Sequence, residues 1–448
     1  MKLKEICIRN FKSLRECRVN LRNFNILVGP NASGKSNFVE LFELLKRIYV
    51  QRDPFPFLKW WGYGNVVWDR NEELPIEVKL LFDIKGYEVS FETIFTGTGG
   101  KFQILKEAIE IKNYLTIERE GEWITIRHDE DFFNDAWAKL QSEIKQKKEV
   151  IFPKFKDVVS RKKEDLIVQK GRVKGEHVPF GLFGYGGTAI YFDELALSYI
   201  HLDFPEKGLI SLEPTEKEIK HSKEAKIEFL KSPLSWIVKN KIRQFMSKIT
   251  VLKDLDFKSI REPQKLIKDL RLSEDGGNVS VVLHNLFLKE KKLPDSVELL
   301  TSGIFPNIEL EFEMTQDGRI FIKGYERYLD RIIELLPPSL PDGLYKILVI
   351  GTAIDLEPSI LIIDEIENSL HPKALELVID TLKDSGITTI LTTHSPAVVD
   401  IVDPEDLILV DKNDQGTIFS RVENPEEIRR ILEEKGITLS ERWLYGKL

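Results

Sequence analysis

The chain has 448 residues, of which 42% are hydrophobic and 31% are charged. This mixture can fill a core and excludes a disordered chain, and the length predicts two or three domains of about 100–200 residues each. Lys and Arg number 65 and Asp and Glu number 73, so the net charge is −8 and any nucleic-acid contact requires a local basic patch. Two cysteines, Cys7 and Cys17, cannot build a disulfide framework or a cysteine-based zinc site.

The distribution of charge and apolar residues predicts where the protein resides. Charged side chains occur throughout the first 18 residues, which is unlike a signal peptide. No apolar run approaches the roughly 18 residues that a membrane span requires. We therefore expect a cytoplasmic protein that has no membrane partner.

The N-terminal part changes from a strand–helix pattern to a pattern of strands alone. Phe24–Val28 is an apolar run that ends at a Gly-Pro pair, and Lys35–Val50 carries apolar residues at helical spacing. From Pro75 to Arg127 apolar and charged residues alternate with period two, which predicts antiparallel hairpins. The glycine-rich segment Thr96–Lys101 is predicted to be one of their turns.

The middle of the chain is rich in charge and is predicted to be mostly helical. Residues 139–174 contain 12 Lys or Arg against 5 Asp or Glu. We interpret this stretch as a solvated helical face, and contact with nucleic-acid phosphates is the alternative. The aromatic residues between Phe55 and Trp68 are predicted to pack inside the protein, with base stacking as the alternative.

The C-terminal hundred residues alternate helices with strands. This order is typical of a parallel sheet that is covered on both faces. The predicted elements are Leu344–Leu356, Ile360–Ile363, Ala374–Lys383, Ile387–Thr393 and Leu407–Val410.

The segment Gly29–Ser36 matches the P-loop pattern between a strand and a helix. Gly29 and Gly34 let the backbone curl so that successive N–H groups point at phosphate oxygens. Lys35 supplies a cation for the β and γ phosphates, and the Ser36 hydroxyl is a ligand for Mg²⁺. We expect ATP and Mg²⁺ to bind at Gly29, Pro30, Asn31, Ala32, Ser33, Gly34, Lys35, Ser36 and Asn37.

Two further apolar strands end in polar side chains. Ile360–Ile363 ends in Asp364, expected to hold Mg²⁺, and Glu365, expected to orient and deprotonate the attacking water. The strand that follows ends at His394, 29 residues beyond Glu365. A histidine at this position can hydrogen-bond the γ-phosphate and sense its hydrolysis.

Together these segments resemble the ABC-like P-loop ATPases of the RecF/SMC/OLD type, in particular AAA-type ATPases with a short helical insertion. Ile8–Leu14 is similar to their N-terminal strand motif, which implies that Lys12 approaches the nucleotide. Asp364–Pro372 is similar to their acidic strand and D-loop, and Thr393–Pro396 to their His switch. The implied fold is an α/β ATPase head with an antiparallel β lobe and an inserted, mostly helical arm.

The resemblance also implies a dimer and an organisation in three parts. In this family two heads pair around two ATP molecules, each held by one head's P-loop and the other head's signature loop. That loop would be Leu340–Leu344, with Asp342 and Gly343 contacting the nucleotide, and Pro341 stands where the family usually has Ser. The expected parts are residues 1–130 (P-loop and β lobe), 131–264 (helical insertion) and 265–448 (signature loop, acidic strand, D-loop and His switch).

The implied function is Mg²⁺-dependent hydrolysis of ATP to ADP and phosphate, coupled to homodimerisation in a DNA-related process such as repair or genome maintenance. One alternative is the ATPase component of an antiviral defence or toxin–antitoxin system that acts with a separate effector protein. A second alternative is an ATP-binding switch with little hydrolysis, which Pro341 motivates. Besides a second copy of the chain, DNA and a separate effector are therefore the candidate partners.

Overall fold

The computed structural model describes residues 1–113, 115–120, 123–128, 166–169, 233–268 and 270–446. They form two compact units, one made of Met1–Lys12 and Arg47–Gln244 and the other of Ser13–Lys46 and Phe245–Leu448. Most of the predicted insertion, with its basic stretch, lies outside the described residues. Among the helices within these ranges, none has the length and apolar character needed to cross a membrane.

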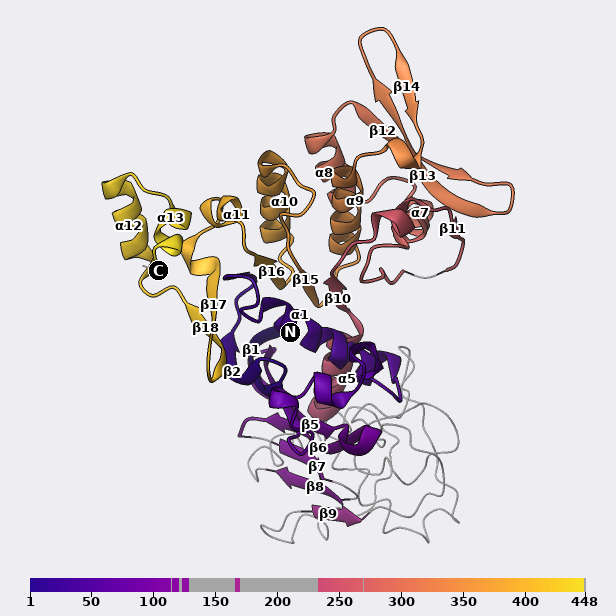
Figure 1. The fold of residues 1–448 in the computed structure, drawn as a ribbon. Coiled ribbons are helices and arrows are strands. Elements are labelled where there is room, and N and C mark those ends of the chain that lie inside the picture. Colours follow the sequence, from indigo (N-terminus) through magenta and orange to yellow (C-terminus); the bar gives the residue numbers. More distant parts are fainter. Residues whose placement is uncertain (114, 121–122, 129–165, 170–232, 269, 447–448) are drawn as a thin grey trace, which may run out of the picture. The chain divides into compact units, whose positions relative to one another are not determined.

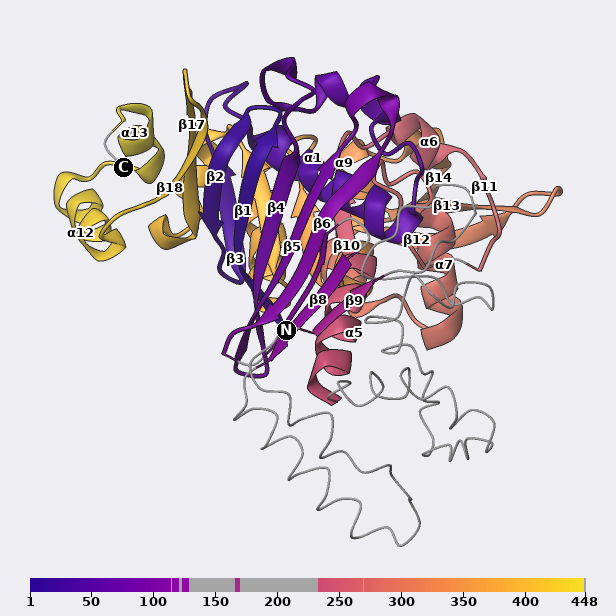
Figure 2. The ribbon, with the colours of Figure 1, turned by 90° about the horizontal axis from the view of Figure 1, so that it is seen from below.

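The first unit is built on an antiparallel sheet, which Figure 2 shows as a row of strands. In order across the sheet, the strands are β1 (Lys2–Phe11), β4 (Ile76–Ile84), β5 (Tyr87–Thr96), β6 (Gln103–Ile111), β7 (Leu115–Glu120), β8 (Trp123–His128) and β9 (Leu166–Gln169). The period-two pattern is confirmed, because Ile76, Val78 and Leu80 are buried while the residues between them are half-buried. The turn predicted at Thr96–Lys101 joins β5 to β6.

The aromatic segment of this unit follows a short π-helix, η1 (Arg47–Gln51), and contains three short 3-10 helices, η2 (Leu58–Trp60), η3 (Tyr63–Asn65) and η4 (Trp68–Arg70). Phe57, Trp60 and Tyr63 are buried, as predicted, and the rings of Phe57 and Tyr63 lie 4.9 Å apart. The neighbouring Trp61 is 91% exposed, so the segment packs with only part of its aromatic side chains.

The second unit contains a six-stranded sheet that draws on three distant parts of the sequence. Every neighbouring pair is parallel except the last, which is antiparallel. The order across the sheet is β10 (Ile249–Leu252), β15 (Ile360–Ile363), β16 (Thr389–Thr393), β3 (Phe24–Val28), β17 (Leu407–Asn413) and β18 (Gly416–Arg421). The parallel sheet predicted for the C-terminal part is thus confirmed, and β10 joins it from the end of the segment predicted to be an insertion.

The register of this sheet brings the ends of four strands to one edge. Leu252 is paired with Ile363, and Ile363 with Leu391. Thr393 is paired with Val28 on the next strand. Because the strands are parallel, the residues that follow β10, β15, β16 and β3 lie at the same carboxyl edge, where ligands bind in open α/β sheets.

Helices cover both faces of the sheet in the second unit. Figure 1 shows α9 (Asp342–Asp355) and α10 (Pro372–Asp384) on one face and α1 (Lys35–Lys46) on the other. Residues Leu344 to Ile354 of α9 are all buried, because this helix lies under further helices. The remaining helices described in this unit are α6 (Phe257–Arg261), α7 (Val279–Glu290), α8 (Asp295–Ile304), α11 (Pro396–Asp400), α12 (Pro425–Lys435) and α13 (Leu439–Leu444), while most of α5 (Pro233–Ser247) belongs to the first unit.

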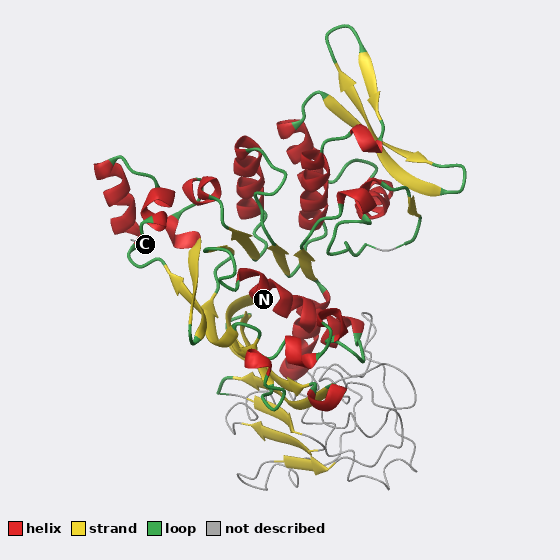
Figure 3. Ribbon diagram, viewed as in Figure 1, coloured by secondary structure: helices red, strands yellow, loops and turns green. Residues whose placement is uncertain are grey.

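A smaller sheet completes the unit. β13 (Arg319–Arg327) pairs with β11 (Gln264–Lys265), β12 (Ile308–Met314) and β14 (Ile332–Leu335) in an antiparallel sheet. Figure 3 shows these strands projecting beyond α8 and α9. Strand β2 (Leu14–Asn20) precedes β3 in the chain. In β12 the glutamates alternate with apolar residues, so one face of this sheet is acidic while the other packs on the core.

Close packing of α8 against α9 generates a stability prediction. A Cβ atom on Gly351 would lie 3.0 Å from the Cα and 3.1 Å from the backbone N of Val297. A Cβ on Gly303 would instead meet the end of the flexible Leu377 side chain. We expect Gly351→Ala to lower the free energy of unfolding by about 1–3 kcal/mol through overpacking. Gly303→Ala is expected to be neutral or stabilising by helix propensity. Urea denaturation of both variants checks this, and equal effects would contradict it.

Candidate nucleotide site

The loop between β3 and α1 is shaped by close backbone contacts. A Cβ on Gly29 would lie 2.0 Å from the carbonyl oxygen of Val410, so only glycine fits there. Gly34 has φ +112°, and a Cβ there would lie 2.1 Å from the Thr417 hydroxyl. Ala32 also adopts a left-handed conformation. The curled loop that the P-loop pattern predicts is therefore present, and Gly29 and Gly34 cannot be exchanged for larger residues.

Lys35 begins α1 and turns its side chain back onto the loop. Its Nζ donates hydrogen bonds to the carbonyl oxygens of Gly29, at 2.7 Å, and Pro30, at 2.9 Å. Burial lowers the pKa of Lys35, while the carboxylates of Asp364 and Glu365 oppose that change. A buried ammonium facing this loop is suited to receive phosphate oxygens, which would compensate its charge. The buried Ser33 hydroxyl has no hydrogen-bond partner among the described residues, so it could donate to the same phosphates.

The loop is held from behind by a network that sequence patterns do not reveal. The hydroxyl of Thr417, on β18, donates to the Ser33 carbonyl oxygen at 2.8 Å and lies 2.7 Å from the hydroxyl of Ser13. The Asn37 amide donates to the same Ser13 hydroxyl at 2.7 Å. Asn37 therefore contacts the support of the loop, and Thr417 fixes the loop from a residue 384 positions away from Ser33.

The acidic residue at the end of β15 lies beside the first turn of α1. Burial raises the pKa of Asp364, and hydrogen bonds from Thr392 and Ser36 and the charge of Lys253 oppose that change. A carboxylate next to a serine hydroxyl offers two oxygen ligands of the kind that Mg²⁺ takes together with phosphate oxygens and water. The donor set of Asp364 and Ser36 thus fits Mg²⁺.

Lys253 follows β10 and lies next to this acid, although no sequence motif marks it. Its Nζ donates to Glu40 of α1 at 2.6 Å. Burial alone would lower the pKa of Lys253, but the hydrogen bond and charge of Glu40 raise it. The lysine therefore carries a fixed positive charge at the same edge of the sheet as Asp364.

Glu365 begins the turn that leads out of β15. Its backbone is left-handed, with φ +49°, and its N–H donates to the Thr392 hydroxyl at 2.9 Å. One carboxylate oxygen accepts a hydrogen bond from the Asn368 amide at 2.7 Å. The other carboxylate oxygen is not used by this bond, and so the side chain is oriented while it keeps an acceptor for water.

His394 follows β16 and is joined to the same turn. Its ring Nδ1 lies 3.1 Å from a carboxylate oxygen of Glu367, and its backbone N–H donates to that oxygen at 2.9 Å. The side chain is 43% exposed. The ring is thus oriented by Glu367 and remains open to a ligand at the carboxyl edge of the sheet.

The loop before α9 is organised by an arginine and packs on the turn after β15. Arg261 pairs with Asp342, donates to the Leu340 carbonyl oxygen at 3.1 Å and lies 5.2 Å from the ring centroid of Tyr345. A Cβ on Gly343 would lie 2.9 Å from the carbonyl oxygen of Ser369. The predicted signature loop and D-loop of one chain therefore touch each other.

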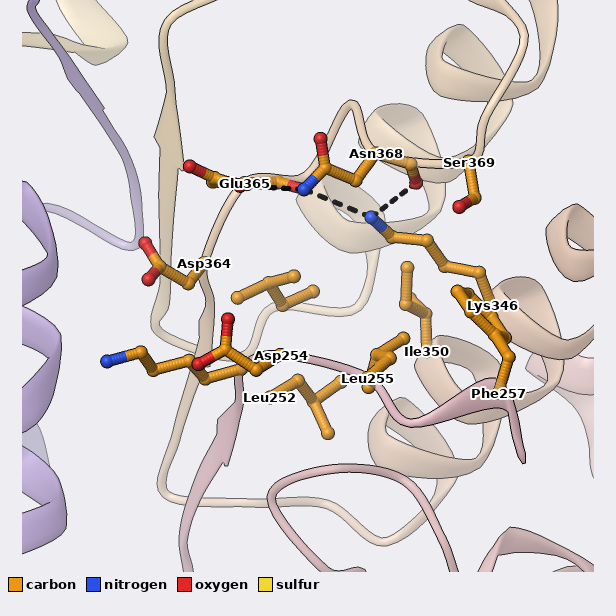
Figure 4. Close-up of a pocket in the computed structure, with 12 residues that line it drawn as sticks. Leu252, Asp254, Leu255, Phe257, Lys346, Ile350, Asp364, Glu365, Asn368 and Ser369 are labelled. Carbon is orange, nitrogen blue, oxygen red and sulfur yellow. Dashed lines mark hydrogen bonds between the residues drawn. The ribbon is translucent and has the colours of Figure 1, made fainter. Parts of the chain in front are cut away.

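A cavity of about 380 Å³ opens between the ends of β10 and β15, α9 and this turn (Figure 4). Its lining combines charged and polar side chains that follow both strands with apolar side chains. The lining residues are Leu252, Lys253, Asp254, Leu255, Phe257, Lys346, Ile350, Ile363, Asp364, Glu365, Asn368 and Ser369.

The structure brings most of the predicted site residues together within the second unit. The loop Gly29–Ser36, the acids after β15 and His394 meet at one edge of the sheet. Lys12 belongs to the first unit, where its Nζ lies 5.6 Å from the ring centroid of Trp60. Sequence analysis missed Thr417, Lys253 and Lys346, and among these only Lys253 could have been suggested, by its place directly after an apolar run.

The sheet order and the residues at its carboxyl edge define a P-loop ATPase of the ABC-like, SMC/RecF type. The chain belongs to the family described as "AAA domain, putative AbiEii toxin, Type IV TA system", whose model matches residues 24–142 and 124–400.

Curated relatives share a smaller region. The methionine import ATP-binding protein MetN of Clostridioides difficile (strain 630) is 24% identical over 221 residues, which cover 45% of this chain and 61% of that protein. MetN 4 of Oceanobacillus iheyensis is 29% identical over 111 residues, covering 22% of this chain and 32% of that protein. The chain thus spans less than two thirds of the length of these relatives.

Solved structures with a similar arrangement include heads of SMC proteins. The SMC head domain from Thermotoga maritima has 14% sequence identity and a TM-score of 0.40, and the match covers 94% of this chain and all of that one. The SmcHead bound to the C-winged helix domain of ScpA has 11% identity and a TM-score of 0.49, with 96% of this chain and all of that one covered.

The support behind the phosphate loop generates a second prediction. Thr417→Val keeps the shape of the side chain but removes the donor to the Ser33 carbonyl oxygen and the hydroxyl partner of Ser13. We expect a loss of about 1–3 kcal/mol in unfolding free energy and weaker nucleotide binding. Thr381→Val is the matched control, because its hydroxyl bonds only to Leu377 within α10. Denaturation and nucleotide titration of both variants measure the effects, and equal losses would contradict the role of Thr417.

Proposed function

We propose that this protein binds ATP with Mg²⁺ and hydrolyses it to ADP and phosphate. The observation that carries the proposal is the convergence of the loop Gly29–Ser36, Asp364 with Glu365, and His394 at one edge of a parallel sheet. This arrangement offers a curled backbone and a buried lysine for phosphates, two oxygen ligands for Mg²⁺ and a carboxylate for water.

In this proposal each group has one task. Lys35 and the loop N–H groups hold the phosphates, Ser36 and Asp364 hold Mg²⁺, and bound Mg²⁺ neutralises charge that develops on the phosphate oxygens. Glu365 accepts the proton of the water whose oxygen attacks the γ-phosphorus, while the bond to the β-phosphate oxygen breaks. His394, oriented by Glu367, hydrogen-bonds the γ-phosphate.

The proposal includes pairing of two heads around ATP. Asp342 and Gly343 stand at the N-terminus of α9, where N–H groups without helical partners favour an anion. Arg261 contacts this loop through Asp342 and the Leu340 carbonyl oxygen. Pro341 precedes the helix as its N-cap and makes no side-chain cap hydrogen bond, so backbone N–H groups alone would contact the partner's γ-phosphate.

Two biological uses are compatible with such a head. The sequence motifs resemble RecF and SMC proteins, and on that basis we propose coupling of hydrolysis to a DNA-related process such as repair or genome maintenance. The description of the family favours a second candidate, the ATPase component of a toxin–antitoxin or defence system with a separate effector. Stimulation of turnover by DNA supports the first use, and a stoichiometric effector that copurifies with the chain supports the second.

Turnover assays test the proposed chemistry. We expect Glu365→Gln to lower kcat for ATP at least about a hundredfold, because the amide cannot accept the proton from water, while ATP still binds. Glu376→Gln, on the exposed side of α10, is the control and should keep the turnover of the natural chain. Turnover that is slow and unchanged in Glu365→Gln would contradict hydrolysis at this site and would favour the ATP-binding switch.

A further inference from the structure

Lys346 is a lysine in the interior of the protein that none of the sequence motifs explains. It lies one turn after Gly343 on α9, and only 3% of its surface is exposed. Burial lowers the pKa of Lys346 to about 8, although the carboxylates of Glu367 and Glu365 oppose that change. Burying an ammonium group is costly, so its retention at a position surrounded by apolar helix residues calls for a specific contact.

That contact is the turn between Glu365 and Ser369. Lys346 Nζ donates to the carbonyl oxygen of Glu365 at 3.0 Å and to that of Asn368 at 2.7 Å, as Figure 4 shows. Both Glu365 and Ser369 adopt left-handed backbone conformations, with φ +49° and +62°. Such conformations cost energy in residues other than glycine and persist only where surrounding contacts enforce them. The two hydrogen bonds of Lys346 supply that enforcement from the side of α9.

The start of α9 is thereby attached at two points, Gly343 and Lys346, to the turn between Glu365 and Ser369. Gly343 packs directly on the Ser369 carbonyl, and Lys346 donates to the carbonyl oxygens of Glu365 and Asn368. On its other side the start of α9 is held by Arg261. A shift of the helix start therefore has to move the backbone of the turn, and with it the Glu365 side chain that Asn368 orients.

We propose that Lys346 is a positioning residue that ties the turn carrying Glu365 to the start of α9, so that docking of the signature loop on a partner's ATP aligns Glu365 on the ATP of its own head. This inference rests on the proposed function and adds to it a route between the two ATP sites. The lysine touches neither nucleotide and acts on Glu365 of its own chain.

A steady-state comparison gives the first test. Lys346→Met keeps the length of the side chain but removes both donors. We expect kcat to fall about tenfold or more, while KM for ATP stays within about threefold, because phosphate binding by the loop is untouched. Lys289→Met, an exposed lysine of α7, is the control and should match the natural chain. An unchanged kcat in Lys346→Met, or a loss confined to KM, would overturn the proposal.

Mixing inactive variants gives the second test, because it separates action within one head from action across the dimer. Equal amounts of Lys346→Met and Glu365→Gln should not recover turnover, since each head then lacks a working Glu365. Recovery would mean that Lys346 acts on the partner's site and would overturn the proposal. The positive control mixes Pro341→Glu, which places a negative charge at the exposed N-cap of α9, with Glu365→Gln, and should recover turnover through the one intact composite site.

The controls distinguish a failure of the proposed head pairing from a failure of the role of Lys346. If the natural chain shows no turnover, or if the Pro341→Glu mixture also stays inactive, the proposed head pairing fails rather than the role of Lys346. Should Lys346→Met melt below the assay temperature, Lys346→Gln, which keeps two N–H donors without the charge, is measured in the steady-state assay. Full kcat in Lys346→Gln supports the role of the hydrogen bonds, and a loss equal to a deletion of Glu365 would contradict it.

Discussion

The register of four parallel strands is the constraint on which the site depends. β10, β15, β16 and β3 are paired so that Leu252, Ile363, Thr393 and Val28 end at one edge. The residues that follow these strands are, in the same order, a lysine, two acids, a histidine and the phosphate loop. A slip of one residue would turn these side chains to the opposite face, and the apolar residues of all four strands keep the register by filling the core.

Charged side chains of both signs, buried or half-buried, lie close together at this edge. Lys35, Lys253 and Lys346 face Asp364, Glu365, Glu367 and Glu40, and each lysine uses backbone carbonyls or a carboxylate as its present partner. Burial raises the pKa of Asp364 and lowers that of Lys35, so further partners of opposite charge would stabilise the charged forms at the site. A Mg²⁺ ion beside Asp364 and phosphate oxygens beside Lys35 would complete it.

The sequence predicted the elements whose signals are local. The P-loop, the apolar strand before Asp364 and the alternating strands of the β lobe each occupy a short stretch with one clear period. Thr417 escaped because its partner Ser33 lies 384 residues away, and Lys346 escaped because one lysine in an apolar helix leaves the helical period unchanged. Lys253 was hidden because β10, a strand of only four residues, was assigned to the predicted helical insertion.

Nucleotide binding by the phosphate loop is the property on which the proposed function depends. The most direct measurement is a titration of ATP with Mg²⁺ against the natural chain and Lys35→Ala, with thermal unfolding to show that both are folded. We predict saturable binding to the natural chain and a dissociation constant raised at least about a hundredfold in Lys35→Ala, because the buried cation for the phosphates is lost. Equal binding by two folded proteins would contradict the site.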